Sequence, residues 1–289
     1  MTLDEAYRKG RAILEENGIS DAANDAGLLL FDVCGIDKGY LLAHGNEEVN
    51  ITCEDGRENR YFAMVSRRAS HIPLQHILGY TCFMGLTFKV DNRVLVPRQD
   101  TEILVEEVLG HVHDGMRILD LCTGSGCILI SLLNYSNDCF GIGTDISEDA
   151  LFVAKENAKE ILSGKEGTGY EFIKSDIFEN VEGRFDIIVS NPPYIKSDVI
   201  PTLDIEVKDH DPYIALDGGK DGLIFYKRII DEANEHLNIG GALFFEIGYD
   251  EAEPVSQMLK DKGFTEVKII KDYAGLDRVV MGVRSCLTD

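Results

Sequence analysis

The second half of the chain alternates short apolar runs with longer stretches of helical periodicity. From residue 103 onward the apolar runs are RILDL (117–121), CFGIGTDI (139–146), YEFIKSDI (170–177), FDIIVSN (185–191) and ALFFEIG (242–248), followed by FTEVKII and RVVMGV near the end. Runs this short predict buried strands. Strands that alternate with helices at this spacing indicate a parallel sheet covered on both faces. Because ligands bind such sheets at the carboxyl ends of strands, we expect the chemistry there.

Residues 1 to about 70 show no alternating strand pattern and are rich in helix formers. Their pattern predicts short helices near 2–17, 21–34 and 54–70. After Pro73 the chain becomes strand-like over 80–96, with a turn expected at Asp91 and Asn92, which is typical of a β-hairpin. We therefore expect a helical domain over 1–78, a hairpin linker over 79–98 and an α/β domain over 99–289.

Composition and charge narrow the class of protein. The chain has 289 residues, of which 44% are apolar and 27% charged, as in a folded globular protein with a sizeable core. Lys and Arg number 28 against 51 Asp and Glu, so the formal net charge is -23. Residues 1–80 contribute 8 basic and 13 acidic side chains to these totals, so the remainder is the more acidic part. Such a charge opposes binding to a nucleic-acid backbone.

The cysteines and the N-terminus indicate a cytosolic protein. The seven cysteines are an odd number with no C-x-x-C pair, which fits neither a disulfide framework nor a zinc finger. The N-terminus lacks an apolar signal core, and no run approaches the roughly 18 apolar residues that span a bilayer. We expect reduced thiols and no membrane association.

A glycine-rich turn, 122–126, follows the first strand of the α/β domain. Its glycines let a ligand approach the backbone, and the next helix offers free N–H groups to an anion. Leu129 stands where a G-x-G-x-x-G motif has its third glycine, which favours a group smaller than a pyrophosphate, such as the carboxylate of a methionine moiety. The turn consists of Cys122, Thr123, Gly124, Ser125 and Gly126.

Acidic residues are predicted at three successive strand ends: Asp120, Asp145 and Asp176. Asp145 lies 21 residues after Gly124, where a carboxylate can accept hydrogen bonds from both ribose hydroxyls. Asp176 is placed to lie beside an adenine ring, with Ile177 as an apolar contact. Together with the glycine turn, these acids predict a nucleoside cofactor. The alternative is that they cap the following helices.

The fourth predicted strand ends in the tetrapeptide Asn191-Pro192-Pro193-Tyr194. Its chemistry suits an amide or exocyclic amine, whose N–H groups the Asn191 side-chain oxygen and the Pro192 carbonyl can accept. Proline fixes φ, so that carbonyl is oriented before substrate arrives. Tyr194 is suited to stack on a planar group. The alternative is a rigid strand exit.

These motifs together resemble the PrmC/HemK family of release-factor glutamine N5-methyltransferases. Beyond the glycine turn and NPPY, the resemblance rests on IPLQHILGY (72–80), FMGLTFKVDNRVLVPRQDTE (83–102) and ALDGGKDGLIFYKRII (215–230), and it covers essentially the whole chain. Two departures are visible. Cys122 stands where glycine is common, and His210-Asp211-Pro212 replaces His/Phe-Glu-Pro.

The resemblance implies a Rossmann-like class I methyltransferase domain with a seven-stranded, mostly parallel sheet. It implies S-adenosylmethionine as cofactor and a class I peptide chain release factor, methylated at the glutamine of its Gly-Gly-Gln loop, as protein substrate. The helical domain would help to hold that substrate. By this resemblance the glycine loop is 122–126, the ribose-binding acid is Asp145, the adenine-flanking residue is Ile177 and the glutamine-binding motif is 191–194. With the acids at the strand ends, the predicted cofactor residues are Asp120, 122–126, Asp145, Asp176, Ile177 and Asn191, the substrate residues are 191–194, and the catalytic residues are Asn191, Pro192 and Tyr194.

Several features stay open at this stage. Thr101 and Glu102 could stabilise a helix N-terminus or shape the acceptor site, and Glu246 could border that site or end a strand. One predicted helical face carries four arginines: Arg57, Arg60, Arg67 and Arg68. This face is either a docking face or a solvated surface, and the presence of Met64 within it favours the solvated surface. His111 and His113 lack partner ligands, so no metal is expected. The rival functions are an N6-adenine methyltransferase acting on nucleic acid and a non-catalytic cofactor-binding protein.

Overall fold

The computed structural model describes residues 1–48 and 57–285, and the side chains of 57–59 are outside this description. The chain divides into two compact units. The first comprises Met1–Gly79 and Asp204–His210, and the second comprises Tyr80–Leu203 and Asp211–Asp289. The segment 204–210 thus joins a unit from which it is distant in sequence. Cys53 and Cys286 fall outside the described residues, and Cys82, Cys122, Cys127 and Cys139 carry free thiols.

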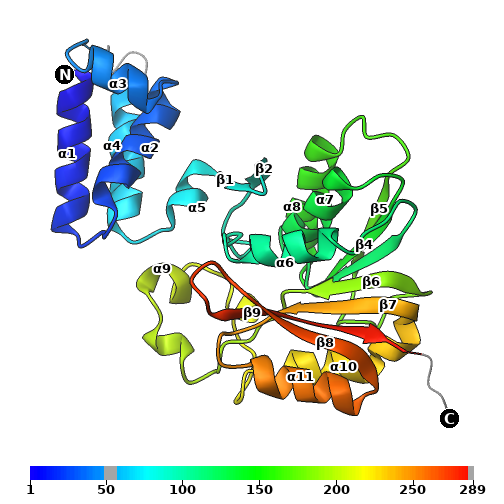
Figure 1. The fold of residues 1–289 in the computed structure, drawn as a ribbon. Coiled ribbons are helices and arrows are strands. Elements are labelled where there is room, and N and C mark those ends of the chain that lie inside the picture. Colours follow the sequence, from blue (N-terminus) through cyan, green and yellow to red (C-terminus); the bar gives the residue numbers. More distant parts are fainter. Residues whose placement is uncertain (49–56, 286–289) are drawn as a thin grey trace. The chain divides into compact units, whose positions relative to one another are not determined.

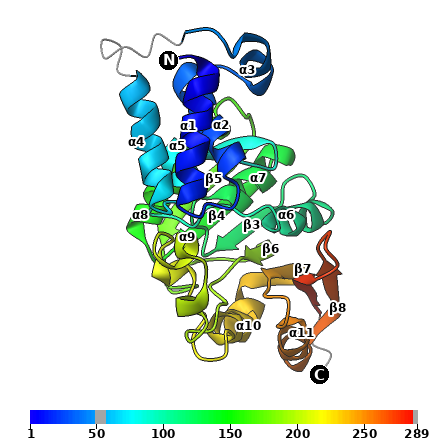
Figure 2. The same ribbon diagram turned by 90° about the vertical axis from the view of Figure 1, so that its left-hand side faces the viewer.

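The first unit is a small helical bundle (Figures 1 and 2). Thr2 caps its first helix in a reciprocal capping box with Glu5, and Gly35 ends the second in the left-handed conformation. The three predicted helices are confirmed over their described residues, whereas two short helices, α3 and α5, were not predicted. The helices are α1 (Leu3–Glu16), α2 (Ala22–Cys34), α3 (Lys38–His44), α4 (Arg57–Ala69), α5 (Leu74–Leu78) and α9 (Ile205–Lys208).

A buried ion-pair cluster holds α2, α4 and α9 of the first unit together. The Arg68 guanidinium on α4 donates from Nε to Asp25 at 2.6 Å and from Nη2 to Glu206 at 2.5 Å. Arg68 is only 4% exposed, so its interpretation as part of a solvated arginine surface is wrong. Arg60 pairs with Asp32 at 3.1 Å. The side chain of Arg57 lies outside the described residues.

The linker contains the predicted hairpin at a different position. Strands β1 (Tyr80–Phe83) and β2 (Leu86–Lys89) pair antiparallel, with Met84 and Gly85 between them. Both turn residues have positive φ, 51° and 71°, as a two-residue hairpin turn requires. A turn also forms at Asp91, whose carbonyl accepts from Val94, but no strand follows it because 93–96 is not paired.

The second unit is built on a mixed seven-stranded sheet with the order β5-β4-β3-β6-β7-β9-β8. The first five strands are parallel, and β9 is antiparallel to both β7 and β8, so the predicted class I methyltransferase architecture is confirmed. The strands are β3 (Arg117–Leu121), β4 (Phe140–Asp145), β5 (Gly169–Lys174), β6 (Phe185–Ser190), β7 (Leu237–Glu246), β8 (Phe264–Lys271) and β9 (Asp277–Arg284).

Helices cover both faces of this sheet, as predicted (Figure 1). Consecutive residues of a strand point to opposite faces of the sheet and so enter different cores. Ile118 and Ile187 lie in one core, and their next neighbours Leu119 and Ile188 lie in the other. The first core is closed by α6 (Thr101–Leu109), α7 (Cys127–Tyr135) and α8 (Glu148–Ile161), and the second by α10 (Ile224–His236) and α11 (Ala252–Asp261). In the described ranges no helix has both the length and the apolar character needed to cross a membrane.

The order of the strands determines where a ligand can bind. The chain runs outward from β3 through β4 to β5 and then returns to place β6 on the other side of β3. The carboxyl ends of β3 and β6 therefore flank the point at which strand order reverses. The turn 122–126 follows β3 and the 191–194 tetrapeptide follows β6, so the two motifs lie side by side.

Candidate active site

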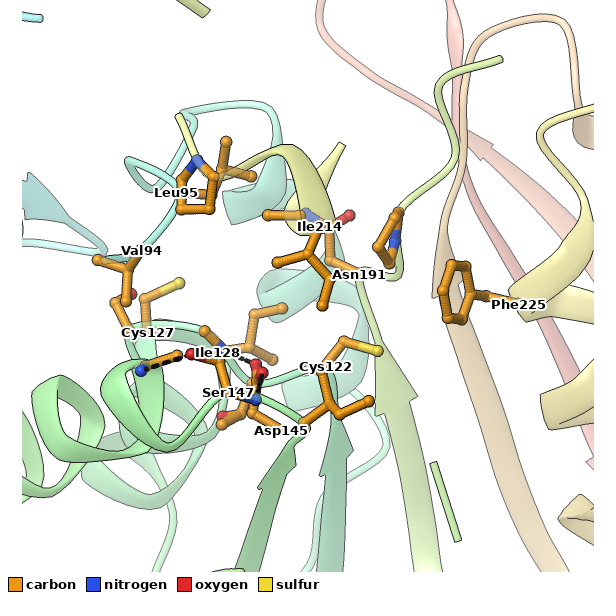
Figure 3. A pocket seen from close by; sticks show the side chains of 18 of the residues that line it. Val94, Leu95, Cys122, Cys127, Ile128, Asp145, Ser147, Asn191, Ile214 and Phe225 are labelled. Carbon is orange, nitrogen blue, oxygen red and sulfur yellow. Dashed lines mark hydrogen bonds between the residues drawn. The ribbon is translucent and has the colours of Figure 1, made fainter. Parts of the chain in front are cut away.

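A cavity of about 220 Å³ in the second unit lies over the carboxyl ends of β3, β4 and β6 (Figure 3). Apolar side chains of the linker, of the region before α10 (Ile224–His236) and of α10 itself form part of its wall, among them Val94, Leu95, Ile214 and Phe225. Nine of the predicted site residues line it together: Cys122, Thr123, Gly124, Ser125, Asp145, Asp176, Ile177, Asn191 and Pro193. Asp120, Gly126, Pro192 and Tyr194 are not in its wall.

Asp120 lies beneath the glycine turn and is fully buried. Its Oδ2 accepts a hydrogen bond of 2.6 Å from the Thr123 hydroxyl, so the carboxyl group supports the turn from below. Burial raises the pKa of Asp120 to about 7, and the bond from Thr123 opposes that rise. The structure thus gives this residue a supporting position rather than one in the cavity wall.

Asp145, the last residue of β4, binds the turn directly. Its Oδ2 accepts from the Gly124 N–H at 3.0 Å and its Oδ1 from the Ser147 N–H at 2.9 Å. Burial raises the pKa of Asp145, and the backbone bonds from Ser147 and Gly124 oppose the rise. Each carboxylate oxygen keeps a lone pair for a further donor, so the group can serve the turn and a ligand hydroxyl together.

Asp176 and Ile177 follow β5 rather than ending it, because the strand stops at Lys174, two residues before Asp176. The Ser175 hydroxyl organises this loop by donating to the Ile177 carbonyl at 2.9 Å. Ile177 has a φ of 54° and is 4% exposed, and it contributes to both the core and the cavity wall. The Asp176 carboxylate pairs with Arg228 across 2.9 Å.

The tetrapeptide 191–194 begins immediately after β6, whose last residue is Ser190. Asn191 and Pro193 line the cavity, and the Asn191 Nδ2 donates to the Thr101 hydroxyl oxygen at 3.4 Å. The Tyr194 hydroxyl donates to the buried Glu246 carboxylate at 3.3 Å. Figure 3 shows Asn191 and Asp145 projecting from different strand ends toward the same space.

The segment 215–222 supports the backbone that follows Tyr194. The Ile195 N–H donates to the Leu216 carbonyl at 3.0 Å, and the Gly218 N–H donates to the Ile195 carbonyl at 2.8 Å. A Cβ atom at position 218 would lie 2.6 Å from the Tyr194 Cα, so glycine permits this close approach. The stretch 215–230, on which the family resemblance partly rests, therefore contacts and supports the backbone beside the 191–194 tetrapeptide.

Comparison with known proteins agrees with this geometry over the whole chain. The PrmC N-terminal domain model matches residues 5–79 and the Methyltransferase small domain model matches 98–204. A release factor glutamine methyltransferase of Clostridium acetobutylicum is 39% identical over 99% of this chain and 100% of its own. One of Agrobacterium fabrum is 41% identical over 93% of each chain. The chain belongs to the family of release factor glutamine methyltransferases.

A solved structure supports the same fold for this family member. A methyltransferase from Pyrococcus furiosus superposes with a TM-score of 0.53 at 21% identity, covering 80% of this chain and 100% of that one. The full-length relatives confirm the resemblance drawn from the motifs and the assignment as a methyltransferase enzyme.

Two buried polar side chains of this family member, Asn157 and Asp211, have partners for which the sequence carried no signal. Asn157 on α8 accepts from the Lys89 N–H at 2.8 Å and donates to the Ser125 carbonyl at 2.9 Å, so it joins the hairpin to the glycine turn. Arg98, in the cavity wall, pairs across 2.7 Å with Asp211, whose side chain is fully buried. The shorter acid of the His-Asp-Pro departure therefore still reaches an arginine.

The cavity residues fit an S-adenosylmethionine molecule. A Cβ atom at Gly124 would meet nothing within 4 Å, so open space lies directly over the turn. Helix α7 begins at Cys127, directly after the turn, and directs free N–H groups to that region. Asp145 offers acceptors and the linker offers apolar surface. The Cys122 thiol does not add a reactive group, because burial raises its pKa well above the ordinary range.

Proposed function

We propose that this chain transfers the methyl group of S-adenosylmethionine to the side-chain amide nitrogen of a glutamine in a class I peptide chain release factor. The observation that carries the proposal is the shared cavity: Asn191 lines the same space as the glycine turn and Asp145. A cofactor held by one wall is thereby brought to an amide held by the other. The names of the full-length relatives supply the substrate class.

The cofactor would be held by three groups of residues. The backbone of 122–126 and the start of α7 would bind its methionine portion, Asp145 its ribose hydroxyls, and Asp176 with Ile177 its adenine. When bound, the cofactor supplies an electrophilic methyl group. The apolar linker residues Val94 and Leu95 would exclude water from that group.

The 191–194 tetrapeptide would prepare the poorly nucleophilic amide. The Asn191 Oδ1 and the Pro192 carbonyl would each accept one N–H of the glutamine amide, which orients its nitrogen and favours the pyramidal geometry of attack. The nitrogen would form one new bond to the methyl carbon as the bond between that carbon and the cofactor's sulfonium sulfur breaks, so that the sulfur leaves as a neutral thioether, and the nitrogen would then lose one proton to solvent. No strong base is needed beforehand, because the N–H becomes acidic only as the N–C bond forms.

The first unit would supply contact area for the release factor, since one glutamine side chain is too small to be selected alone. Residues 1–80, which form most of this unit, have 8 basic and 13 acidic side chains, whereas residues 81–289 have 20 basic and 38 acidic side chains, which disfavour a nucleic-acid phosphate backbone. Free thiols at Cys82, Cys122, Cys127 and Cys139 fit a cytosolic enzyme that acts on the translation machinery.

The test is methyl transfer from labelled cofactor to a purified release factor, with a variant of that factor carrying alanine for the loop glutamine and with adenine-containing DNA as alternative acceptors. We expect label on the unmodified release factor alone. Label on DNA would support the adenine methyltransferase instead, and cofactor binding without transfer to any acceptor would support a non-catalytic binding protein.

A further inference from the structure

The orientation of the Asn191 amide decides whether the proposed site works. The oxygen and nitrogen of an asparagine amide have nearly the same size but opposite hydrogen-bonding character. With Oδ1 toward the cavity, the side chain can accept an N–H of the substrate. With Nδ2 there, two donors would face each other. A neighbour that distinguishes the two ends is therefore needed.

Thr101 is the neighbour that contacts this amide. It is 2% exposed, it lies at the start of α6, and its Oγ1 is 3.4 Å from the Asn191 Nδ2. The hydroxyl has no part in capping, because the N-cap residue is Asp100 and α6 has no side-chain cap bond. A hydroxyl can donate one hydrogen bond and accept others, so the direction of its own proton determines which end of Asn191 it prefers.

Glu246 is the acceptor that would set that direction. It is the last residue of β7 and is 2% exposed; its Oε1 accepts from Tyr194, and its Oε2 is buried without a hydrogen-bond partner among the described residues. Burial raises the pKa of Glu246, whereas the Thr101 hydroxyl and the charge of Arg278 oppose the rise. In the arrangement proposed below, the Thr101 hydroxyl proton points to the ionised Glu246 carboxylate, whose buried Oε2 is an acceptor without a donor among the described residues. Once its proton points there, the hydroxyl oxygen can only accept from Asn191.

We propose that Thr101 and Glu246 are positioning residues that hold the Asn191 side chain with its oxygen toward the cavity. The same carboxylate also holds the Tyr194 hydroxyl, so the first and last residues of the 191–194 tetrapeptide are fixed from one buried group. Neither residue reacts; both act through Asn191. This inference rests on the proposed function, because it concerns the glutamine amide that Asn191 would bind.

The test compares Thr101→Val, which keeps the shape and removes the hydroxyl, with Thr101→Ser, which keeps the hydroxyl. With a glutamine peptide as acceptor we expect Thr101→Val to lower kcat by at least about 10-fold, with cofactor Kd within about 3-fold, and Thr101→Ser to stay within about 3-fold in kcat. Thr168→Val is the matched control, because that buried hydroxyl has no partner among the described residues and precedes β5 at its other end. A normal kcat for Thr101→Val, or equal losses for valine and serine, would overturn the positioning role.

A double variant tests whether Thr101 acts through Asn191. In single turnover, Asn191→Ala and Asn191→Ala/Thr101→Val should react at the same rate, because the group that Thr101 orients is already absent. Separate, additive losses would contradict the inference. In the chain that keeps Asn191, Glu246→Gln should lower kcat, because a neutral amide no longer dictates the direction of the Thr101 hydroxyl proton. An unchanged kcat would contradict the role of Glu246.

The activity of the wild-type chain distinguishes a failure of the proposed function from a failure of the positioning role. If it methylates no glutamine, the proposed function fails and the positioning role fails with it. If it methylates glutamine while Thr101→Val retains full kcat, only the positioning role fails.

Discussion

At the scale of single residues, Asn191 and Asp145 line one cavity from different strands and should fail in different ways. Asn191→Ala removes the proposed contact with the substrate amide and leaves the glycine turn untouched. We expect methyl transfer to fall by at least about 100-fold, the scale of losing one positioned hydrogen bond in a transition state. Cofactor affinity should stay within a few-fold. Normal turnover together with a large loss of cofactor affinity would contradict the role of Asn191 in binding the substrate amide.

Asp145→Ala should produce the opposite result. It removes the proposed ribose acceptor and also the partner of the Gly124 and Ser147 N–H groups. We expect cofactor binding to weaken by about 2 kcal/mol, measured by calorimetry. Asp145→Asn is the matched control, because it keeps one oxygen, and it should lose less. Unchanged affinity in the alanine variant would place the ribose site elsewhere.

Asp120 should give the stability of the chain a recognisable pH dependence. Its pKa is about 7 in the folded state, above the value of about 4 for an unfolded aspartate. The contribution of the neutral Asp120 carboxyl to the unfolding free energy is fully present below the unfolded pKa and is lost as pH rises through the folded value of about 7. Between pH 4.5 and 8 the unfolding free energy of the wild type should therefore fall, relative to Asp120→Asn, by roughly 3 kcal/mol in cofactor-free protein. Parallel urea-derived curves for the two proteins would contradict this.

At the scale of elements, the sequence predicted best what depends on local periodicity. Short continuous apolar runs marked all seven strands of the large sheet, because consecutive residues such as Ile118 and Leu119 are both buried, each in a core on a different face. The hairpin turn lies at Met84 and Gly85, whereas the sequence pattern predicts it at Asp91 and Asn92. The reason is that methionine rarely adopts the positive φ that Met84 has, and Asp and Asn are common turn residues. Helices α3 and α5 have only seven and five residues, too few for a clear helical period.

Buried polar partners were the part of the site that local reasoning could not find. Asn157 and Ser125 are 32 positions apart, and Asn191 and Thr101 are 90 apart. Their pairing follows from how strands and helices pack, not from any spacing along the chain. The 122–126 and 191–194 motifs were accessible because each follows a strand whose carboxyl end faces the ligand side of a parallel sheet.

The Arg68 cluster tests how the elements of the first unit hold together. Arg68→Met leaves the Asp25 carboxylate, whose side chain is 7% exposed, without its closest cation, and it removes the pair with Glu206. We expect a loss of about 3 kcal/mol in unfolding free energy from urea denaturation. Arg60→Met is the control, because that side chain is 64% exposed, and it should cost less than about 1 kcal/mol. Equal effects would mean that the buried cluster contributes no more than a surface pair.

At the scale of the whole molecule, the chain that leaves the 191–194 tetrapeptide contributes α9 to the first unit before it returns to the second. The proposed substrate-docking role of the first unit therefore involves residues from both parts of the sequence. Glu206, which pairs with Arg68, is the clearest of them.

Deleting residues 1–70 should separate docking from chemistry. We expect kcat/KM for an intact release factor to fall far more than kcat/KM for a short Gly-Gly-Gln peptide, which carries only the residues that fill the cavity. The control is that the truncated chain folds and binds cofactor with wild-type affinity. Equal losses on the two substrates would contradict a docking role.

The most direct test of the central claim is to locate the transferred methyl group. A release factor incubated with cofactor and this enzyme would be digested and its peptides sequenced by tandem mass spectrometry, with the Asn191→Ala enzyme in parallel. The account predicts one methyl group on the side-chain nitrogen of the Gly-Gly-Gln glutamine, and almost none with the variant. A methyl group on any other residue, or equal modification by both enzymes, would contradict it.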